Sequence, residues 1–248
     1  MTQSIEVRHI RVEFQTPSGA VLAVRDVSMS VPPSEFMCIL GPSGCGKTTV
    51  LNCLAGFITP SAGEILVDGK PVAARGFDRG VVFQDLTQLF PWRTARQNIE
   101  YGLEVRKMPA SQRHARAAEL LRLITLEKFA DAYPHELSGG MQQRVAIARA
   151  LAYDPGILLM DEPFGALDAM TRDNMQRQLT EIWSATKKTV VYITHNVSEA
   201  VFLGDQIMIM GPQGTIGATL RNEISRPRDP LSDEFVKLQR QVLSYLTH

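Results

Sequence analysis

One short segment of the sequence has the glycine and lysine spacing of a phosphate-binding loop. Residues 41–48 satisfy the pattern G-x-x-x-x-G-K-[ST]. Glycines let the backbone bend around phosphate oxygens with its N–H groups pointing inward, and Lys47 adds a cation for the β- and γ-phosphates. The Thr48 hydroxyl can ligate Mg²⁺. The candidate phosphate contacts are Gly41, Pro42, Ser43, Gly44, Cys45, Gly46, Lys47, Thr48 and Thr49.

The residues around this loop decide between a ligand site and a glycine-rich turn that binds nothing. The continuous apolar run Phe36–Leu40 precedes it, as a buried parallel strand would, and the helix-compatible run 48–54 follows. A helix in that position directs its positive N-terminal end at a bound anion. The context therefore favours a phosphate site.

Two adjacent acids form the second candidate group. The apolar run Ile157–Met160 ends in Asp161 and Glu162. Carboxylates at the carboxyl end of a parallel strand lie in the crevice where open α/β sheets bind ligands. One acid could hold Mg²⁺ and the next could orient and deprotonate a water. The alternative is that the two acids before Pro163 are merely solvated. The presence of a phosphate loop in the same chain makes this alternative less favoured.

A third group is a second helix start suited to anions. Ser138 can cap a helix whose first turn holds Gly139 and Gly140, and glycines there leave backbone N–H groups unshielded.

The elements that must position these groups indicate an α/β fold. Between the later apolar runs lie helical stretches, which predicts strands joined by crossover helices in a mostly parallel sheet. Segments 5–14 and 21–31 alternate more between apolar and polar residues, which predicts antiparallel strands. Asp68-Gly69 predicts a hairpin turn. The predicted parallel strands lie at 36–40, 80–83, 157–160, 190–193 and 206–210.

Two further segments have a helical composition. Residues 94–151 are rich in good helix formers and predict a helical subdomain inserted into the core formed by 1–93 and 152–230. After this domain of residues 1–230, the tail 231–248 predicts one amphipathic helix packed on the core. Its apolar positions are Leu231, Phe235, Leu238, Val242 and Leu246.

Composition narrows the classes of function. The 248 residues carry 26 Lys plus Arg and 26 Asp plus Glu, and this neutrality argues against a nucleic-acid-coating protein. No apolar run approaches the roughly 18 residues that span a bilayer. Three cysteines within 38–53 are no disulfide framework and suit a reducing cytosol.

The string Leu-Ser-Gly-Gly-Met-Gln-Gln-Arg at 137–144, together with the loop and the acids, resembles the ATP-binding subunits of ABC transporters. The resemblance covers about residues 5–225 and implies that fold, a phosphate-loop NTPase core with a mostly parallel sheet, an N-terminal antiparallel part and a helical insertion. Met141 departs from the glutamine that many members carry. ATP and Mg²⁺ are the implied ligands.

The resemblance also implies roles for individual residues. Gln84 matches the glutamine that touches Mg²⁺, His195 the switch histidine at the γ-phosphate, and Asp168 the D-loop. Phe14 stands where an aromatic residue stacks on adenine. The implied catalytic residues are Glu162, His195 and Gln84, and the implied Mg²⁺ ligands are Thr48, Gln84 and Asp161. Cys45 is expected to react with a maleimide that blocks ATP binding.

In this family two subunits face each other head to tail, and Ser138, Gly139 and Gly140 of one complete the nucleotide site of the other. The implied partners are a second copy, two integral membrane permease subunits and, indirectly, a solute-binding protein, with the chain on the cytoplasmic face of the plasma membrane. The string Leu89-Phe90-Pro91-Trp92 resembles the nitrate, sulfonate and taurine importer branch. Those apolar residues could line a groove for a permease helix or be ordinary core.

Two other classes remain as alternatives. A soluble ABC-type ATPase acting on DNA or ribosomes usually has two modules or a long coiled coil, neither of which is evident. A small-molecule kinase would not carry the 137–144 string. We predict no nucleic-acid partner, and the sequence identifies neither the solute, the permease nor the transport direction.

Overall fold

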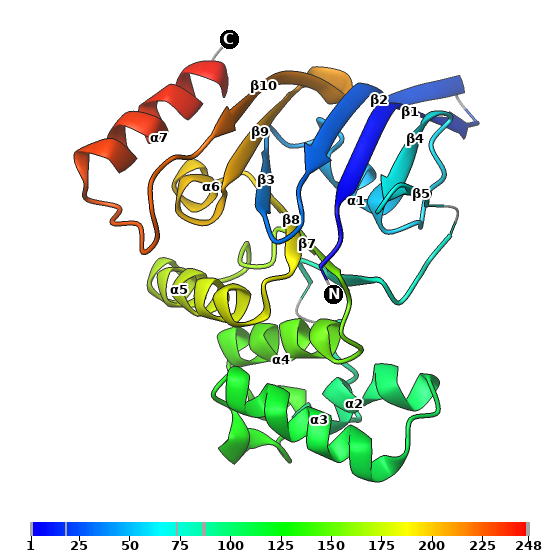
Figure 1. Ribbon diagram of the computed structural model, residues 1–248, viewed down its shortest axis with the longest axis vertical. Coiled ribbons are helices and arrows are strands. Elements are labelled where there is room, and N and C mark those ends of the chain that lie inside the picture. The colour runs from blue at the N-terminus through cyan, green and yellow to red at the C-terminus, as the bar shows by residue number, and fades with distance from the viewer. Residues whose placement is uncertain (1, 18, 73, 86–87, 247–248) are drawn as a thin grey trace.

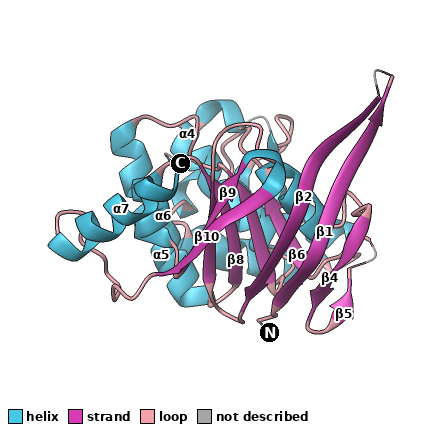
Figure 2. Ribbon diagram, turned by 90° about the horizontal axis from the view of Figure 1, so that it is seen from above, coloured by secondary structure: helices cyan, strands magenta, loops and turns pink. Residues whose placement is uncertain are grey.

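The strands of the computed structural model form two sheets, and the model describes residues 2–17, 19–72, 74–85 and 88–246. One sheet is antiparallel with the order β2-β1-β4-β5, and the other has the order β10-β9-β3-β8-β7-β6. In the second sheet β3, β6, β7, β8 and β9 run parallel, while β10 is antiparallel to β9 (Figure 2). The strands are β1 Ile5–Thr16, β2 Gly19–Val31, β3 Phe36–Leu40, β4 Ala62–Val67, β5 Lys70–Pro71, β6 Arg79–Val82, β7 Ile157–Asp161, β8 Thr189–Thr194, β9 Gln206–Gly211 and β10 Thr215–Arg221.

The helices cover the six-stranded sheet and form a separate group at one end of the molecule. Helices α2, α3 and α4 lie together at the bottom of Figure 1, and α5, α6 and α7 gather on one side of the strands (Figures 1 and 2). The helices are α1 Lys47–Leu54, α2 Ala95–Val105, α3 Ala110–Leu123, α4 Gly139–Leu151, α5 Ala169–Thr186, α6 Val197–Leu203 and α7 Asp233–Leu246. Among the described residues, none of the helices is both long and apolar enough to cross a bilayer.

The predicted strand before the loop shows why these runs are continuously apolar. All five residues of β3 are buried, and they alternate between two clusters. Phe36, Cys38 and Leu40 pack among the helices on one face. Met37 and Ile39 pack toward α1 and the antiparallel sheet on the other. Since both faces are covered, the side-chain period of two gives no polar alternation.

The C-terminal helix packs on the core as predicted, but it begins later than the apolar pattern indicates. Phe235 and Val242 are buried, and Leu238 packs partly against the core. Ser232 caps α7 through its hydroxyl, which accepts from the Phe235 N–H at 3.3 Å. Leu231 therefore precedes the helix, and its 88% exposure shows that including it in the packed face is wrong.

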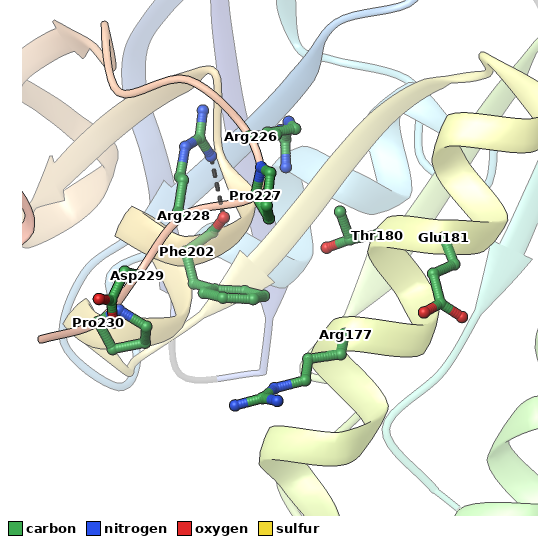
Figure 3. Close-up of a pocket in the computed structure, with 9 residues that line it drawn as sticks. All are labelled: Arg177, Thr180, Glu181, Phe202, Arg226, Pro227, Arg228, Asp229 and Pro230. Carbon is green, nitrogen blue, oxygen red and sulfur yellow. Dashed lines mark hydrogen bonds between the residues drawn. The ribbon is translucent and has the colours of Figure 1, made fainter.

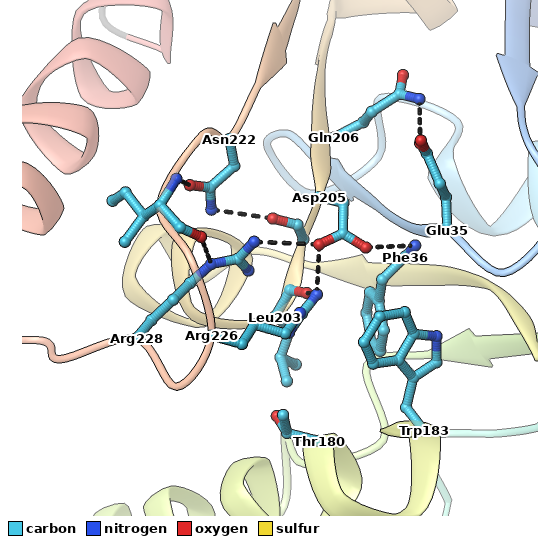
Figure 4. Close-up of polar contacts among 12 residues, drawn as sticks. Glu35, Phe36, Thr180, Trp183, Leu203, Asp205, Gln206, Asn222, Arg226 and Arg228 are labelled. Atoms are coloured by element: carbon cyan, nitrogen blue, oxygen red, sulfur yellow. Dashed lines mark hydrogen bonds and ion pairs between the residues drawn. The ribbon is translucent and has the colours of Figure 1, made fainter. Parts of the chain in front are cut away.

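A partly buried acid, Asp205, holds the segment between β10 and α7 in place. Asp205 Oδ1 accepts from Arg226 at 2.7 Å and from Arg228 at 3.1 Å, while its Oδ2 accepts from the Phe36 N–H at 3.1 Å (Figure 4). The Arg226 guanidinium also lies over the Trp183 ring, 4.4 Å from its centroid. Burial lowers the pKa of Arg228 to about 10. This cluster therefore connects the C-terminal segment to β3 and α5.

Replacing this acid should destabilise the fold without touching the candidate site. Asp205→Asn leaves the Arg228 side chain, which is 2% exposed, without its carboxylate. Loss of one partner of a buried ion pair costs about 3 kcal/mol of unfolding free energy. Urea denaturation measures the change, with exposed Asp173→Asn as the matched control. Equal midpoints for Asp205→Asn and the control would show that the pairing contributes nothing.

Candidate nucleotide-binding site

The segment from Gly41 to Gly46 forms a tight loop between β3 and α1. Gly44 has φ +78° and Gly46 has φ +102°, both in the left-handed region that favours glycine. A Cβ on Gly46 would also lie 2.6 Å from the Ala23 carbonyl oxygen of β2. Glycine at position 46 is therefore required by both backbone conformation and space. The predicted strand, loop and helix are all present.

Lys47 extends along the inside of this loop. It is 6% exposed, and its Nζ donates to the carbonyl oxygens of Gly41 at 2.8 Å and Pro42 at 2.9 Å. These bonds hold the cation beside a hollow of about 260 Å³. The hollow is lined by Ala23, Ser43, Gly44, Gly46, Lys47, Thr48, Thr49 and Glu162. Loop, cation and acid thus surround one space.

Of the two acids at the end of β7, Glu162 lines the same hollow, and Asp161 interacts with Thr48, which also lines it. Burial raises the pKa of Asp161, and its hydrogen bond with the Thr48 hydroxyl opposes that rise. A carboxylate beside a hydroxyl supplies the hard oxygen atoms that Mg²⁺ prefers. The donor set of Asp161 and Thr48 therefore fits the metal. Groups of three or more His, Cys, Asp or Glu side chains suited to a metal do not occur in the described chain.

Glu162 has a strained backbone and a defined partner. Its φ is +42°, unusual for a residue with a side chain, and its N–H donates to the Ile193 carbonyl oxygen at 3.0 Å. Its carboxylate accepts from His195 Nδ1 at 2.8 Å. The turn after β7 thus aims the acid at the hollow and connects it to the end of β8.

Gln84 lies two residues beyond the end of β6 and is exposed. A Cβ on Gly165 would come within 3.0 Å of its Nε2, so its amide lies against the turn that follows Glu162. Asp168 caps α5, and its carboxylate accepts from the Thr171 N–H at 2.9 Å. This hydrogen bond lowers the pKa of Asp168.

The second anion-binding element faces a different hollow. Ser138 caps α4, and its Oγ accepts from the Met141 N–H at 3.4 Å. Ser138 and Gly140 line a hollow of about 400 Å³ with Thr171 and Arg177 of α5. None of the residues lining it lines the phosphate-loop hollow. Within one described chain, the two predicted halves of a nucleotide site therefore stay separate.

Cys45 and Phe14 do not line the hollow at the phosphate loop. Cys45 is 3% exposed and packs in the apolar cluster between the sheets, so the expectation that a maleimide reaches it is wrong. Phe14 is 38% exposed near the end of the β1–β2 hairpin and is not among the residues lining the hollow. Sequence reasoning missed Ala23, which closes the hollow from β2 and carries no chemical signal.

A hollow of about 420 Å³ lies apart from the predicted motifs. Figure 3 shows it between α5, Phe202 of α6 and the segment 226–230, with Arg177 and Glu181 projecting from α5. None of the predicted nucleotide-binding residues lines it.

Comparison with known proteins identifies the class. The ABC transporter family model matches residues 24–165. An uncharacterised ABC transporter ATP-binding protein of Methanocaldococcus jannaschii is 45% identical over 247 residues, 99% of this chain and 92% of that protein. A taurine import ATP-binding protein of Rhizobium johnstonii is 50% identical over 210 residues, 84% of this chain and 80% of that protein.

Solved structures give the same class. A dimeric bacterial ABC transporter cassette superposes with a TM-score of 0.78 at 34% identity, covering 89% of this chain and all of that one. The same cassette bound to ADP and Pi, in a state after hydrolysis, superposes with a TM-score of 0.77 at 33% identity and with the same coverage.

The chain therefore belongs to the ABC transporter family. It is an ATPase of that family, and the predicted fold class and family resemblance are both confirmed.

Removing the loop cation should weaken nucleotide binding. Lys47→Ala eliminates a charged donor that faces the hollow, and a charged hydrogen bond contributes roughly 1.5–3 kcal/mol. We expect ATP affinity to fall by the corresponding factor and hydrolysis to be lost. Calorimetric titration and an ATPase assay test this, with exposed Lys128→Ala as the control. Unchanged turnover in Lys47→Ala would remove the loop from the nucleotide site.

Proposed function

We propose that this chain hydrolyses ATP as a head-to-tail homodimer to power a membrane importer for a small anion such as nitrate, a sulfonate or taurine. The observation that carries the proposal is the separation of the two hollows. Lys47 and Glu162 line one, and Ser138 lines the other. A chain with half of each site needs a second copy to enclose a nucleotide, and a cassette of the same fold is described as dimeric.

The residues divide the work of hydrolysis in this proposal. The loop N–H groups and Lys47 bind the phosphates, with Phe14 stacking on adenine. Thr48, Asp161 and Gln84 would hold Mg²⁺, which neutralises phosphate charge when bound. Glu162 takes a proton from the attacking water, whose oxygen bonds to the γ-phosphorus as the bond to ADP breaks. His195 donates to the Glu162 carboxylate at 2.8 Å and thereby fixes its direction.

The import role rests on relatives. The protein of Rhizobium johnstonii, half of whose aligned residues are identical, is named for taurine import. We propose that this chain likewise acts at the cytoplasmic face of the plasma membrane with two permease subunits and, indirectly, a solute-binding protein. Its neutral charge and its relatives give no support to a role on nucleic acid or ribosomes.

We also propose that residues 1–93 and 152–230 act as one nucleotide-binding core and 94–151 as a helical subdomain, with 231–248 as a C-terminal appendage. The helices α2, α3 and α4 in Figure 1 give this division a structural counterpart.

An aromatic hollow near Gln84 is the proposed permease-docking surface. Its volume is about 320 Å³, and Phe57 and Phe77 in its lining are 40% and 50% exposed. Phe83, directly before Gln84, stacks on Phe57 with ring centroids 6.3 Å apart. The 89–92 string has two interpretations, as part of a permease groove or as ordinary core. Leu89 belongs to the core, at 3% exposure, whereas Trp92 is 71% exposed. Exposed aromatic rings of this kind suit an apolar helix of a membrane subunit.

The catalytic proposal is tested by Glu162→Gln. The amide keeps the size but cannot accept the proton, and loss of a general base costs about 10²–10⁴ in rate. ATP should still bind, because the loop and Lys47 are untouched, so that ATP rather than ADP should trap two copies together. Size-exclusion chromatography and ATPase rates measure both effects, with exposed Glu127→Gln as the control. Wild-type turnover in Glu162→Gln would refute the role of this acid.

The docking surface is tested by Phe77→Asp. A charge in the aromatic hollow should lower the yield of co-purified membrane subunits about tenfold, since buried aromatic anchors carry much of the binding energy at interfaces. Affinity purification of the tagged chain from detergent-solubilised native membranes measures this. Leu231→Asp places the same change on an exposed residue outside the hollow. Equal recovery with both variants would exclude this surface.

A further inference from the structure

A buried acid lies beneath the switch histidine and has no role in the site described so far. Glu199, in the first turn of α6, is 4% exposed. Its carboxylate accepts hydrogen bonds from the Thr194 hydroxyl and from Gln176 Nε2, the latter at 3.4 Å. Within the described chain, no Lys, Arg or His lies within ion-pair distance of it. Burying a carboxylate in this way is costly, so its retention calls for a reason.

Ordinary helix capping does not explain the position of this carboxylate. In a capping box, an acid three residues into the helix accepts from the backbone N–H of the cap residue. Here the cap is Asn196, whose side chain accepts from the Glu199 N–H at 3.2 Å. The Asn196 N–H donates instead to Thr194 Oγ1 at 3.0 Å. The Glu199 side chain is therefore directed inward, away from the helix end.

The inward carboxylate fixes the residues on both sides of His195. The Thr194 hydroxyl donates to Glu199 and accepts from the Asn196 N–H, which closes a ring of hydrogen bonds around the switch residue. His195, held between them, contacts the Glu162 carboxylate at 2.8 Å. The histidine is itself exposed, so packing alone does not determine its direction.

The same carboxylate reaches the helix that follows the D-loop. Gln176 lies on α5, which begins after Asp168. Arg172, one turn earlier, donates from Nη2 to the Leu167 carbonyl oxygen at 2.8 Å. Glu162, Arg172, His195 and Glu199 line one narrow cleft. Burial raises the pKa of Glu199, and the hydrogen bond from Thr194 and the charge of Arg172 oppose that rise.

We propose that Glu199 is a positioning residue for hydrolysis, which holds His195 against Glu162 through Thr194 and connects both to α5 through Gln176. Any displacement of the Asp168 turn is then transmitted to the catalytic pair. The proposal rests on the roles proposed above for Glu162 and His195.

The first test is Glu199→Gln, measured as kcat and as KM for ATP. The amide keeps one acceptor oxygen and replaces the other with a donor, so that residue 199 can no longer accept from both Thr194 and Gln176. We expect kcat to fall about tenfold, because small misplacements of catalytic groups are costly, with KM changed less than about twofold. Glu234→Gln removes the same charge from the exposed first turn of α7 and controls for helix-end electrostatics.

The second test separates positioning from folding and remains usable if Glu199→Gln does not fold. Thr194→Val removes the linking hydroxyl, whereas Thr194→Ser retains it. We expect the valine variant to lose kcat and the serine variant to keep it. Combining Thr194→Val with Glu199→Gln should add little further loss, because both break one connection.

Several outcomes would overturn the proposal. These are an unchanged kcat in Glu199→Gln, a loss confined to thermal stability, equal kcat in the two Thr194 variants, or fully additive losses. The proposed function fails separately, because its test is turnover in Glu162→Gln, whose result does not depend on Glu199.

Discussion

The parallel pairing of β3, β8 and β7 in one register is the constraint on which the site depends. Leu40 pairs with Thr194, and Asp161 pairs with Ile193, so that the three strands end within one residue of the same row. The phosphate loop, His195 and Glu162 each follow directly from these ends. Since the carboxyl ends of parallel strands share one edge, these residues meet there although they lie far apart in sequence.

Because these strand ends meet, several charged side chains lie close together, and defined hydrogen bonds stabilise them there. Burial and the neighbouring Glu162 raise the pKa of Asp161, while Thr48 and Lys47 act in the opposite direction. The Lys47 ammonium is bound by two loop carbonyl oxygens, and the strained backbone of Glu162 is held by Ile193. A site of this kind keeps unfavourable groups in place because each has a partner in the sheet edge or the loop.

The fold and most site residues could be predicted because each carries a local signal. Apolar runs mark strands buried on both faces, and the loop, the acid pair and the serine cap are contiguous strings. Side-chain direction has no such signal: Cys45 points into the inter-sheet core, although its neighbours face the hollow. Leu231 fits the helical period but precedes the Ser232 cap. The role of Glu199 could not be predicted from the sequence, because its partners Thr194 and Gln176 come from other elements.

Helix α5 is the element through which the two separate hollows can communicate within one chain. Its residues Thr171 and Arg177 line the hollow where Ser138 and Gly140 lie, and Asp168 caps its start. Its Arg172 and Gln176 face the catalytic side, where they approach Glu199. Since a rigid helix moves as a unit, a second copy seated on the hollow lined by Ser138 would shift the groups that contact the segment around His195. If the chain dimerises as proposed, this packing within the single chain would couple dimerisation to hydrolysis.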